Sequence, residues 1–222
     1  MQLHRSHSWD LTPSAAIALQ KELRGEIIVD RPLDLEKVRL IAGVDVSVKN
    51  NVSQAAVVVA TFPELEPVET ALARQPTPFP YVPGLLTFRE GPVLEKAFAE
   101  LSCTPDVFLF DGIGYAHPRR MGIVSHMGLL LQRPAVGCAK TRLCGSHDPV
   151  PDEKGAWTPL VDRGEEIGAV VRTRAGVAPV IVSAGHLADL SSSIELVLRC
   201  CPKYRLPEPI RMAHKAAGAF TP

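Results

Sequence analysis

The segment IAGVDVSV, residues 41–48, places one acidic residue in the middle of an apolar run. Alternation along a strand puts Asp45 on one face with Ile41, Gly43 and Ser47, and the remaining apolar residues on the other face. An ionised carboxylate in mid-strand costs stability unless it is paired, solvated or bound to a cation. The segment therefore predicts a half-buried strand, and it leaves both an ion-paired Asp45 and a metal-binding Asp45 open.

Two more strands are predicted directly after this one. The pattern of apolar and β-branched residues predicts strands over 38–48, 55–62 and 68–73. Asn50 and Asn51 lie between the first two strands and favour a tight turn. Consecutive strands joined by short connections indicate an antiparallel three-strand meander.

A strand–helix–strand unit follows the meander. Residues 106–110 and 134–138 are compact apolar runs typical of buried strands, and 119–131 fits a helix between them. Such a crossover joins parallel strands. Further strands are expected over 167–173 and 179–183, so the sequence predicts a mixed α/β sheet that combines the meander with parallel strands.

Helices are expected on both sides of this sheet. Thr12 and Pro13 predict a helix start, with the helix reaching about Leu23, and Pro92 and Pro209 predict the starts of helices over 93–101 and 209–218. A further helix is expected over 187–198. No repeat or composition break divides the chain, so we expect a single domain over 1–222 with its core at about 36–218.

Two more acidic residues stand at sites where a carboxylate is useful. Asp111 ends the apolar run 107–110, and Glu90 precedes Gly91-Pro92 at the expected start of a helix. Each has an ordinary alternative, as a turn residue or as a helix-start acid. Together with Asp45 they resemble the carboxylates of a ribonuclease-H-like sheet, which converge on Mg²⁺, a cation that prefers oxygen ligands.

Four sequence blocks resemble the endonuclease V family. They are 41–47 (IAGVDVS), 80–90 (PYVPGLLTFRE), 111–140 (DGIGYAHPRRMGIVSHMGLLLQRPAVGCAK) and 204–211 (YRLPEPIR), in the family's order. The blocks cover most of 36–214, and the second and third are long and specific. The resemblance implies a ribonuclease-H-like fold and a Mg²⁺-dependent endonuclease, with Mn²⁺ as a substitute cation.

The resemblance also implies a substrate and a product. The family acts on deaminated purines, above all hypoxanthine (inosine), and hydrolyses the second phosphodiester bond on the 3′ side of the lesion to leave 3′-hydroxyl and 5′-phosphate ends. We therefore expect DNA containing deaminated bases as the partner, with inosine-containing RNA as an alternative substrate. A catalytically silent nucleic-acid-binding protein on the same scaffold is the alternative from another class, although such a relative is expected to lack at least one of the three acids.

The family's functional positions carry over residue by residue. Those of the metal and the catalytic centre match Asp45, Glu90, Asp111, Lys140, His117 and His214. The strand-separating wedge matches Tyr81, in a loop that Pro80 and Pro83 stiffen. Glycines lack a side chain and let the main chain approach a flipped base, which fits Gly84, Gly112 and Gly114.

Apolar residues are expected to wall the base pocket, although core packing is the likelier role for any one of them. The candidates are Leu85, Ile123 and Leu143. The family favours a polar residue at the position of Ile113 and a small or apolar one at Tyr115. The change at Ile113 removes a side-chain hydrogen bond and bears on base preference.

The charge balance is zero, with 24 basic and 24 acidic residues. This excludes a strongly basic or acidic protein, but the charges are unevenly distributed: 112–147 carries five basic residues and no acid, 199–222 has a local excess of four positive charges, and 148–168 has six acids and two bases. The basic segments contain the motif residues, so we expect a phosphate-facing basic side and an acidic back.

The remaining features indicate a cytoplasmic protein. The chain shows no secretory signal and no apolar run long enough for a membrane span, so no membrane partner is expected. Its five scattered cysteines fit a reducing compartment. A monomer is favoured. A hydrolase built on Ser183 and His186 is disfavoured, because no Gly-x-Ser-x-Gly motif surrounds Ser183.

Overall fold

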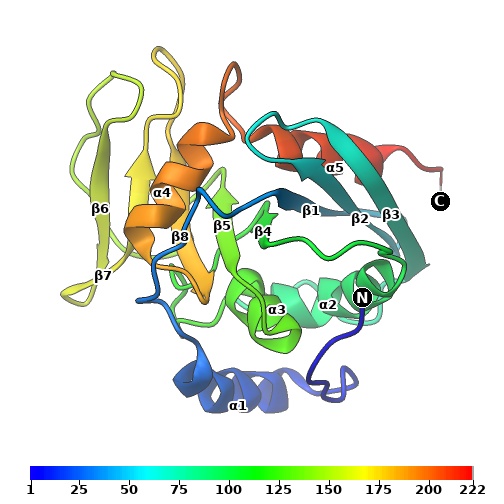
Figure 1. The fold of residues 1–222 in the computed structure, drawn as a ribbon. Helices are drawn as coiled ribbons and strands as arrows, with labels where there is room; N and C mark the ends of the chain where they lie inside the picture. Colours follow the sequence, from blue (N-terminus) through cyan, green and yellow to red (C-terminus); the bar gives the residue numbers. More distant parts are fainter. Residues whose placement is uncertain (222) are drawn as a thin grey trace.

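One mixed sheet contains all the strands of the computed structural model, which describes residues 1–221, in the order β3-β2-β1-β4-β5-β8-β7-β6 (Figure 1). The strands are β1 (Leu40–Lys49), β2 (Val52–Thr61), β3 (Pro67–Pro76), β4 (Val107–Phe110), β5 (Ala135–Ala139), β6 (Trp157–Asp162), β7 (Glu165–Val171) and β8 (Val180–His186). The helices are α1 (Pro13–Leu23), α2 (Leu86–Ala99), α3 (Ile123–Leu131), α4 (Leu190–Arg199) and α5 (Glu208–Gly218), with a 3₁₀ turn η1 (Arg24–Glu26) after α1.

The predicted meander is confirmed. β1 pairs antiparallel with β2, and β2 pairs antiparallel with β3. Asn50 and Asn51 both have positive φ, 47° and 58°, which is the backbone of a two-residue hairpin turn and which asparagine tolerates. The turn residues thus fix the register in which Lys49 faces Val52.

The parallel part of the sheet begins where β4 joins β1. β4 pairs parallel with both β1 and β5, and α3 forms the connection from β4 to β5, as the sequence predicts. β8 then pairs antiparallel with β5. Because β1 and β4 run in the same direction, the ends of both strands reach the same edge of the sheet.

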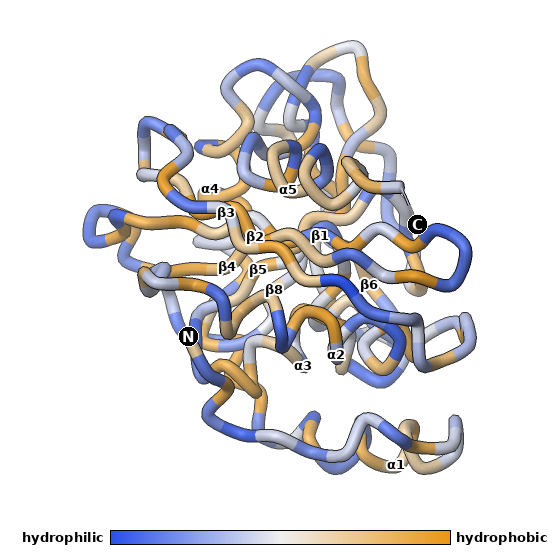
Figure 2. Tube along the Cα trace, turned by 90° about the vertical axis from the view of Figure 1, so that its right-hand side faces the viewer, coloured by the Kyte–Doolittle hydropathy of each residue, from blue (hydrophilic) through white to orange (hydrophobic). Residues whose placement is uncertain are grey.

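The helices form layers on either side of the sheet. Figure 2 shows α4 and α5 above it, α2 and α3 below it, and α1 as a further layer beneath α2 and α3. The core is divided accordingly: Ile41 packs with Ile210 of α5, whereas Ala42 and Val44 pack with Phe98 of α2. The alternation predicted for 41–48 is therefore present in the fold.

Two predicted helix starts were wrong. α2 begins at Leu86, so Pro92 lies inside the helix and Glu90 stands in its second turn. A proline normally costs an internal helix hydrogen bond, but the buried face of α2 packs firmly enough to tolerate it. α3 begins at Ile123 because Arg120 has a φ of 58°, which no α-helix accommodates.

Strand β6 was missed by the sequence analysis. It contains Pro159, which removes a backbone donor and weakens the strand pattern. β6 is the edge strand of the sheet and pairs with β7 on one side, while Val161 alone bridges to Ser146 on the other; an edge strand is a position where proline is tolerated. Within residues 1–221, no helix has the length and apolar character that a membrane crossing requires.

Candidate active site

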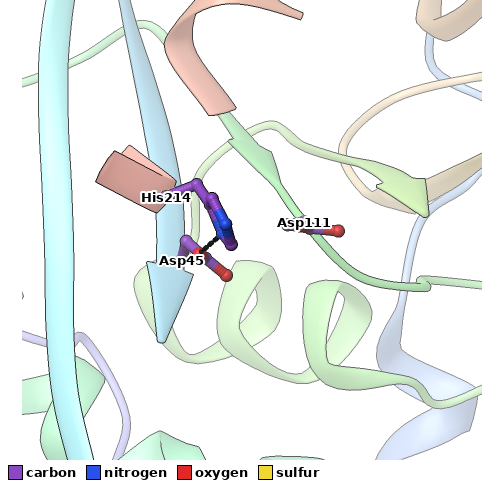
Figure 3. Close-up of side chains that lie close together, drawn as sticks. All are labelled: Asp45, Asp111 and His214. Atoms are coloured by element: carbon purple, nitrogen blue, oxygen red, sulfur yellow. Dashed lines mark hydrogen bonds and ion pairs between the residues drawn. The ribbon is translucent and has the colours of Figure 1, made fainter. Parts of the chain in front are cut away.

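Two aspartates meet where β4 ends beside the middle of β1: Asp111 directly follows β4, and Asp45 is a mid-strand residue of β1. The Asp111 amide donates a hydrogen bond to the Val44 carbonyl at 3.0 Å, which sets Asp111 beside Asp45. Oxygen atoms of Asp45 and Asp111 and a ring nitrogen of His214 all lie within 4.8 Å of one another. Figure 3 shows these three side chains, which come from β1, the end of β4 and α5.

A glycine allows α5 to reach this edge of the sheet. A Cβ atom on Gly43 would lie 2.0 Å from the Pro209 carbonyl oxygen, so only glycine permits this close contact between β1 and the start of α5. α5 then places His214 beside Asp45, the residue that follows Gly43 on the same face of β1. His214 Nδ1 donates to the Asp45 carboxylate at 2.7 Å, so Nε2 is the ring nitrogen left without this contact, on an exposed ring.

The carboxylates repel one another. Burial raises the pKa of Asp45, and the negative charge of Asp111 raises it further, while the hydrogen bond from His214 acts in the opposite direction. Burial raises the pKa of Glu90 to about 8, with a further contribution from Asp45. Among the described residues, no hydrogen bond or ion pair involves the Glu90 carboxyl group. In the part of the chain that the structure describes, the side chains whose ligand atoms lie within 4.8 Å of one another are Asp45, Asp111 and His214, and the predicted Glu90 is not in this group. The two aspartates offer oxygen donors of incompletely neutralised charge, which fit a hard divalent cation.

A lysine neutralises part of this charge. Lys140 directly follows β5, the neighbour of β4, and its Nζ lies 2.5 Å from Asp111 Oδ2. Asp111 is mostly buried, whereas the Lys140 side chain remains 39% exposed. The ammonium group therefore sits at the boundary between the carboxylate cluster and solvent.

A pocket of about 290 Å³ opens beside the carboxylates, and both Asp111 and Lys140 line it. Its other lining residues come from the loop before α2 and the first turn of α2, from the β4–α3 loop and the start of α3, and from the end of β5 and the loop after it. They are Tyr81, Val82, Pro83, Gly84, Leu86, Thr87, Gly112, Ile113, His117, Gly122, Ile123, Ala139, Thr141, Arg142 and Leu143. Tyr81 is 72% exposed, the largest value among the bulky apolar and aromatic residues that are exposed, so its ring stands free beside the pocket.

The predicted substrate residues divide into two groups. Tyr81, Pro83, Gly84, Gly112, Ile123 and Leu143 all line the pocket. Three others do not line it, for different reasons.

Leu85 is 1% exposed and packs with Ala16 and Phe88, so its side chain belongs to the core. Gly114 is buried against the Ala184 carbonyl of β8, where a Cβ would lie 2.3 Å away, and its role is packing. Pro80 lies on a neighbouring depression with Trp9 and Pro92. Leu86 and Thr87 also line the pocket, which the sequence analysis did not predict.

His117 lies in the pocket wall and outside the Asp45–Asp111–His214 cluster. Its Nδ1 accepts a hydrogen bond from the Arg119 amide at 3.1 Å, so its Nε2 carries the proton and donates to the Gly84 carbonyl at 3.0 Å. Burial and, second, the charge of Arg119 lower the pKa of His117 to about 4. His117 is thus a neutral ring that donates a hydrogen bond to the carbonyl of Gly84, the residue with a φ of 80°.

Part of the acidic segment packs against the basic segment. Arg120, from the basic segment, is 6% exposed and pairs with Asp162 at 2.9 Å and Glu165 at 2.7 Å. Tyr115 also donates to Glu165, at 2.5 Å, and lies away from the pocket. The β6–β7 hairpin therefore braces the loop before α3, and this pairing leaves Lys140 and Arg142 as the basic residues at the pocket.

Sequence reasoning also missed two residues behind the pocket. Gln20 of α1 is 1% exposed and contacts both Gly84 and Arg119. A glutamine in an amphipathic helix carries no motif, and only its burial reveals that its amide must be satisfied. Arg119 was counted as a basic surface residue, although it donates to the Gly84 carbonyl at 2.7 Å.

A meander continued by parallel strands, with Asp45 and Asp111 on adjacent strands of one sheet, is a ribonuclease-H-like fold with a candidate metal site. The sequence pattern of the Endonuclease V family matches residues 21–215. The chain belongs to the Endonuclease V family and is a nuclease, a class of hydrolase.

Relatives and solved structures agree along nearly the whole chain. An Endonuclease V of Nostoc sp. is 50% identical over 220 residues, 98% of this chain and 99% of its own. One of Methanothrix thermoacetophila is 47% identical over 96% of this chain and 94% of its own. The crystal structure of the Streptomyces avermitilis Endonuclease V superposes with a TM-score of 0.91 at 39% identity, covering 98% and 96% of the two chains.

A structure with nucleic acid is also similar. The Ciona intestinalis Endonuclease V, in complex with a 24mer DNA containing an inosine followed by a ribo-adenosine, has a TM-score of 0.81 at 30% identity. The similarity covers 92% of this chain and 95% of that one.

Proposed function

We propose that the protein is a divalent-metal-dependent endonuclease that recognises deaminated purines, above all hypoxanthine, and hydrolyses the second phosphodiester bond on their 3′ side. The products are a 3′-hydroxyl and a 5′-phosphate end. One observation carries the proposal: Asp111 belongs both to the carboxylate cluster and to the pocket. A base held in the pocket therefore brings the adjacent backbone to the carboxylates.

The chain's own residues supply distinct parts of this chemistry. Asp45, Glu90 and Asp111 would hold Mg²⁺, or Mn²⁺ in its place, and the bound cation would activate water and neutralise phosphate charge. Lys140 offers an ammonium group to a phosphate oxygen at the pocket edge. His214 offers Nε2 to an attacking water, because Nδ1 is already bonded to Asp45.

The pocket supports base recognition through the main chain. Gly84 and Gly112 bring main chain without side chains to the pocket wall, which lets a flipped base approach closely, and Ile123 and Leu143 offer apolar contact to its faces. The exposed ring of Tyr81 is suited to filling the space that the flipped base leaves. The similar Ciona protein was crystallised with DNA that contains an inosine, which supports the same ligand here.

An oligonucleotide duplex with one deoxyinosine tests the proposal. We expect a single nick in the presence of Mg²⁺ or Mn²⁺, no nick with a chelator, and no nick by Asp45→Asn. Absence of cleavage by folded wild-type protein in either metal would instead favour the silent nucleic-acid-binding protein. That alternative is disfavoured because all three acids are present.

Inosine-containing RNA is the second candidate substrate. The pocket reads the base, and the 2′-hydroxyl distinguishes RNA from DNA at the backbone. Single-turnover kinetics on matched deoxyinosine DNA and inosine RNA would decide which substrate is preferred. A tenfold or greater advantage for RNA would reassign the protein as an inosine-specific endoribonuclease.

We further propose that the protein acts as a monomer in the cytoplasm. All five cysteines are free thiols, which supports a reducing compartment. The carboxylates and the pocket come from one chain. Light scattering at working concentration is expected to give the mass of one chain, and a stable dimer would contradict the monomer.

A further inference from the structure

The first helix contacts the residues behind the base pocket, and one of its buried side chains is polar. α1 lies outside the α2–α3 layer, distant from the sheet (Figure 2). Most of its polar residues are exposed, but Gln20 is only 1% exposed. The family pattern begins at residue 21, one position later.

The amide of Gln20 has both of its ends engaged in hydrogen bonds. Its Nε2 donates to the Gly84 carbonyl at 3.0 Å and to the Met121 carbonyl at 2.9 Å, and its Oε1 accepts from Arg119 Nε at 2.7 Å. Two carbonyl acceptors around one end and a guanidinium donor at the other permit only this orientation of the amide. The side chain is therefore held in a single arrangement.

The two carbonyl groups belong to two different segments that contribute walls of the pocket. Gly84 lies in the loop that carries Tyr81, and Met121 directly precedes Gly122 and Ile123 at the start of α3. Arg119 also donates to the Gly84 carbonyl, which closes a ring of hydrogen bonds behind the pocket. Gln20 thus connects the two walls by direct bonds from one nitrogen atom.

The apolar contacts of α1 are also divided between the loop before α2 and the start of α3. Ala16 packs with Phe79 and Leu85 in the loop on one side, and Leu23 packs with Met121 on the other. The helix therefore contacts both walls along its length, and Gln20 lies between these two contacts in the sequence. Without α1 the loop and the start of α3 would lose a common support.

We infer that Gln20 is a positioning residue that holds the two walls of the pocket at a fixed separation. Through Gln20, α1 thereby sets the affinity of the pocket for a purine base. The inference rests on the proposed function for its kinetic consequence. Its structural consequence, that the loop and the start of α3 loosen together when the amide is lost, does not depend on any activity.

Two variants separate the functions of the amide. Gln20→Met keeps the length of the side chain and removes all three bonds. Gln20→Glu keeps an acceptor for Arg119 but has no donor for Gly84 or Met121. Lys21→Met, at the exposed neighbouring position of the same helix, is the matched control.

Single-turnover nicking of a deoxyinosine duplex is measured against enzyme concentration. Misplacing a binding group by a fraction of an ångström to an ångström lowers efficiency by roughly ten- to hundredfold. We expect both Gln20 variants to raise the half-saturating enzyme concentration by about that factor, with a smaller change in the maximal rate. A variant that is merely partly unfolded would change the half-saturating concentration only in proportion to its inactive fraction, which a folded-fraction measurement corrects.

Hydrogen exchange without substrate provides the second measurement. In Gln20→Met, amides in 79–88 and 119–124 are expected to exchange faster together, while those of α4 and α5 keep the wild-type rate. Wild-type affinity and wild-type exchange in both variants would overturn the inference. Coupled loosening in a protein whose wild type nicks nothing would instead leave the inference standing and reject the proposed function.

Discussion

Lys140 Nζ lies 2.5 Å from Asp111 Oδ2, across the ends of the neighbouring parallel strands β5 and β4. The pair lies at the point where the carboxylate cluster meets the base pocket, and both residues line that pocket. The ammonium group is therefore positioned to bind a phosphate group that enters the site beside Asp111.

Lys140→Met is expected to slow single-turnover nicking about a hundredfold or more, because one positive charge directed at the developing phosphate charge is lost. Binding of the deoxyinosine duplex should weaken much less. Lys37→Met, which removes the same charge from an exposed residue paired only with Asp34, is the control and should nick at the wild-type rate. A rate for Lys140→Met within about threefold of wild type would remove Lys140 from the catalytic centre.

Asp45→Asn should make the metal-free protein more stable while abolishing activity. The pKa of Asp45 is raised by burial and by Asp111, so its stabilising contribution exists at low pH and is lost as pH rises through the folded pKa. At pH 7 the substitution replaces a charged, buried carboxylate beside Asp111 by a neutral amide. This removes the unfavourable free energy of that charge, so the melting temperature should rise by a few degrees.

Magnesium should act differently on the two proteins. At about a hundred times its Kd, a ligand stabilises by about 2.7 kcal/mol. Wild-type protein should therefore melt at a higher temperature with Mg²⁺, and Asp45→Asn should lose most of that shift. An identical Mg²⁺ shift in both proteins would place the cation elsewhere.

Acid should destabilise the protein through His117. Its pKa is about 4 in the folded chain, against an ordinary value of 6.5, so the unfolded state binds the extra proton between these values. Stability contributed by the neutral ring is present above about pH 6.5 and falls by up to about 3 kcal/mol as pH drops to about 4. Urea unfolding of His117→Gln should show a shallower loss over this window. Parallel pH curves for the two proteins would contradict a buried neutral imidazole.

Tyr81→Ala should weaken binding to lesion duplexes roughly tenfold, because stacking between an aromatic ring and a base contributes about 1–3 kcal/mol. Single-stranded deoxyinosine substrates should bind within about twofold of wild type, since no base pair has to be opened. Trp157→Ala, which removes an exposed aromatic ring from the edge strand β6, is the control. Equal losses on duplex and single strand would argue against a wedge.

Much of the fold follows from local sequence patterns. The Asn50-Asn51 turn and the alternation around Asp45 predict the meander correctly, because both depend on neighbouring residues. The errors arise where tertiary packing overrides a local signal. Taken alone, Pro92 predicts a helix start, but α2 continues past Pro92 because the buried face of the helix packs in the core.

The candidate site was predictable only in part. Asp45 within β1 and Asp111 at the end of β4 can be found from the sequence, since an unpaired carboxylate in or beside an apolar run is costly. The Gly84–Gln20 contact joins residues 64 positions apart, and no spacing rule connects them. Gly114 shows the converse, because a glycine next to a motif packs against β8 and not against the pocket.

The position of the nick tests the central claim most directly. A duplex with a single deoxyinosine, labelled at either end of the lesion strand, should be cut in Mg²⁺ at the second phosphodiester bond on the 3′ side. The products should carry a 3′-hydroxyl and a 5′-phosphate, and Asp111→Asn should give no product. Cleavage at the lesion itself, cleavage independent of deoxyinosine, or full activity in Asp111→Asn would contradict the account in which Asp111 joins the pocket to the carboxylate cluster.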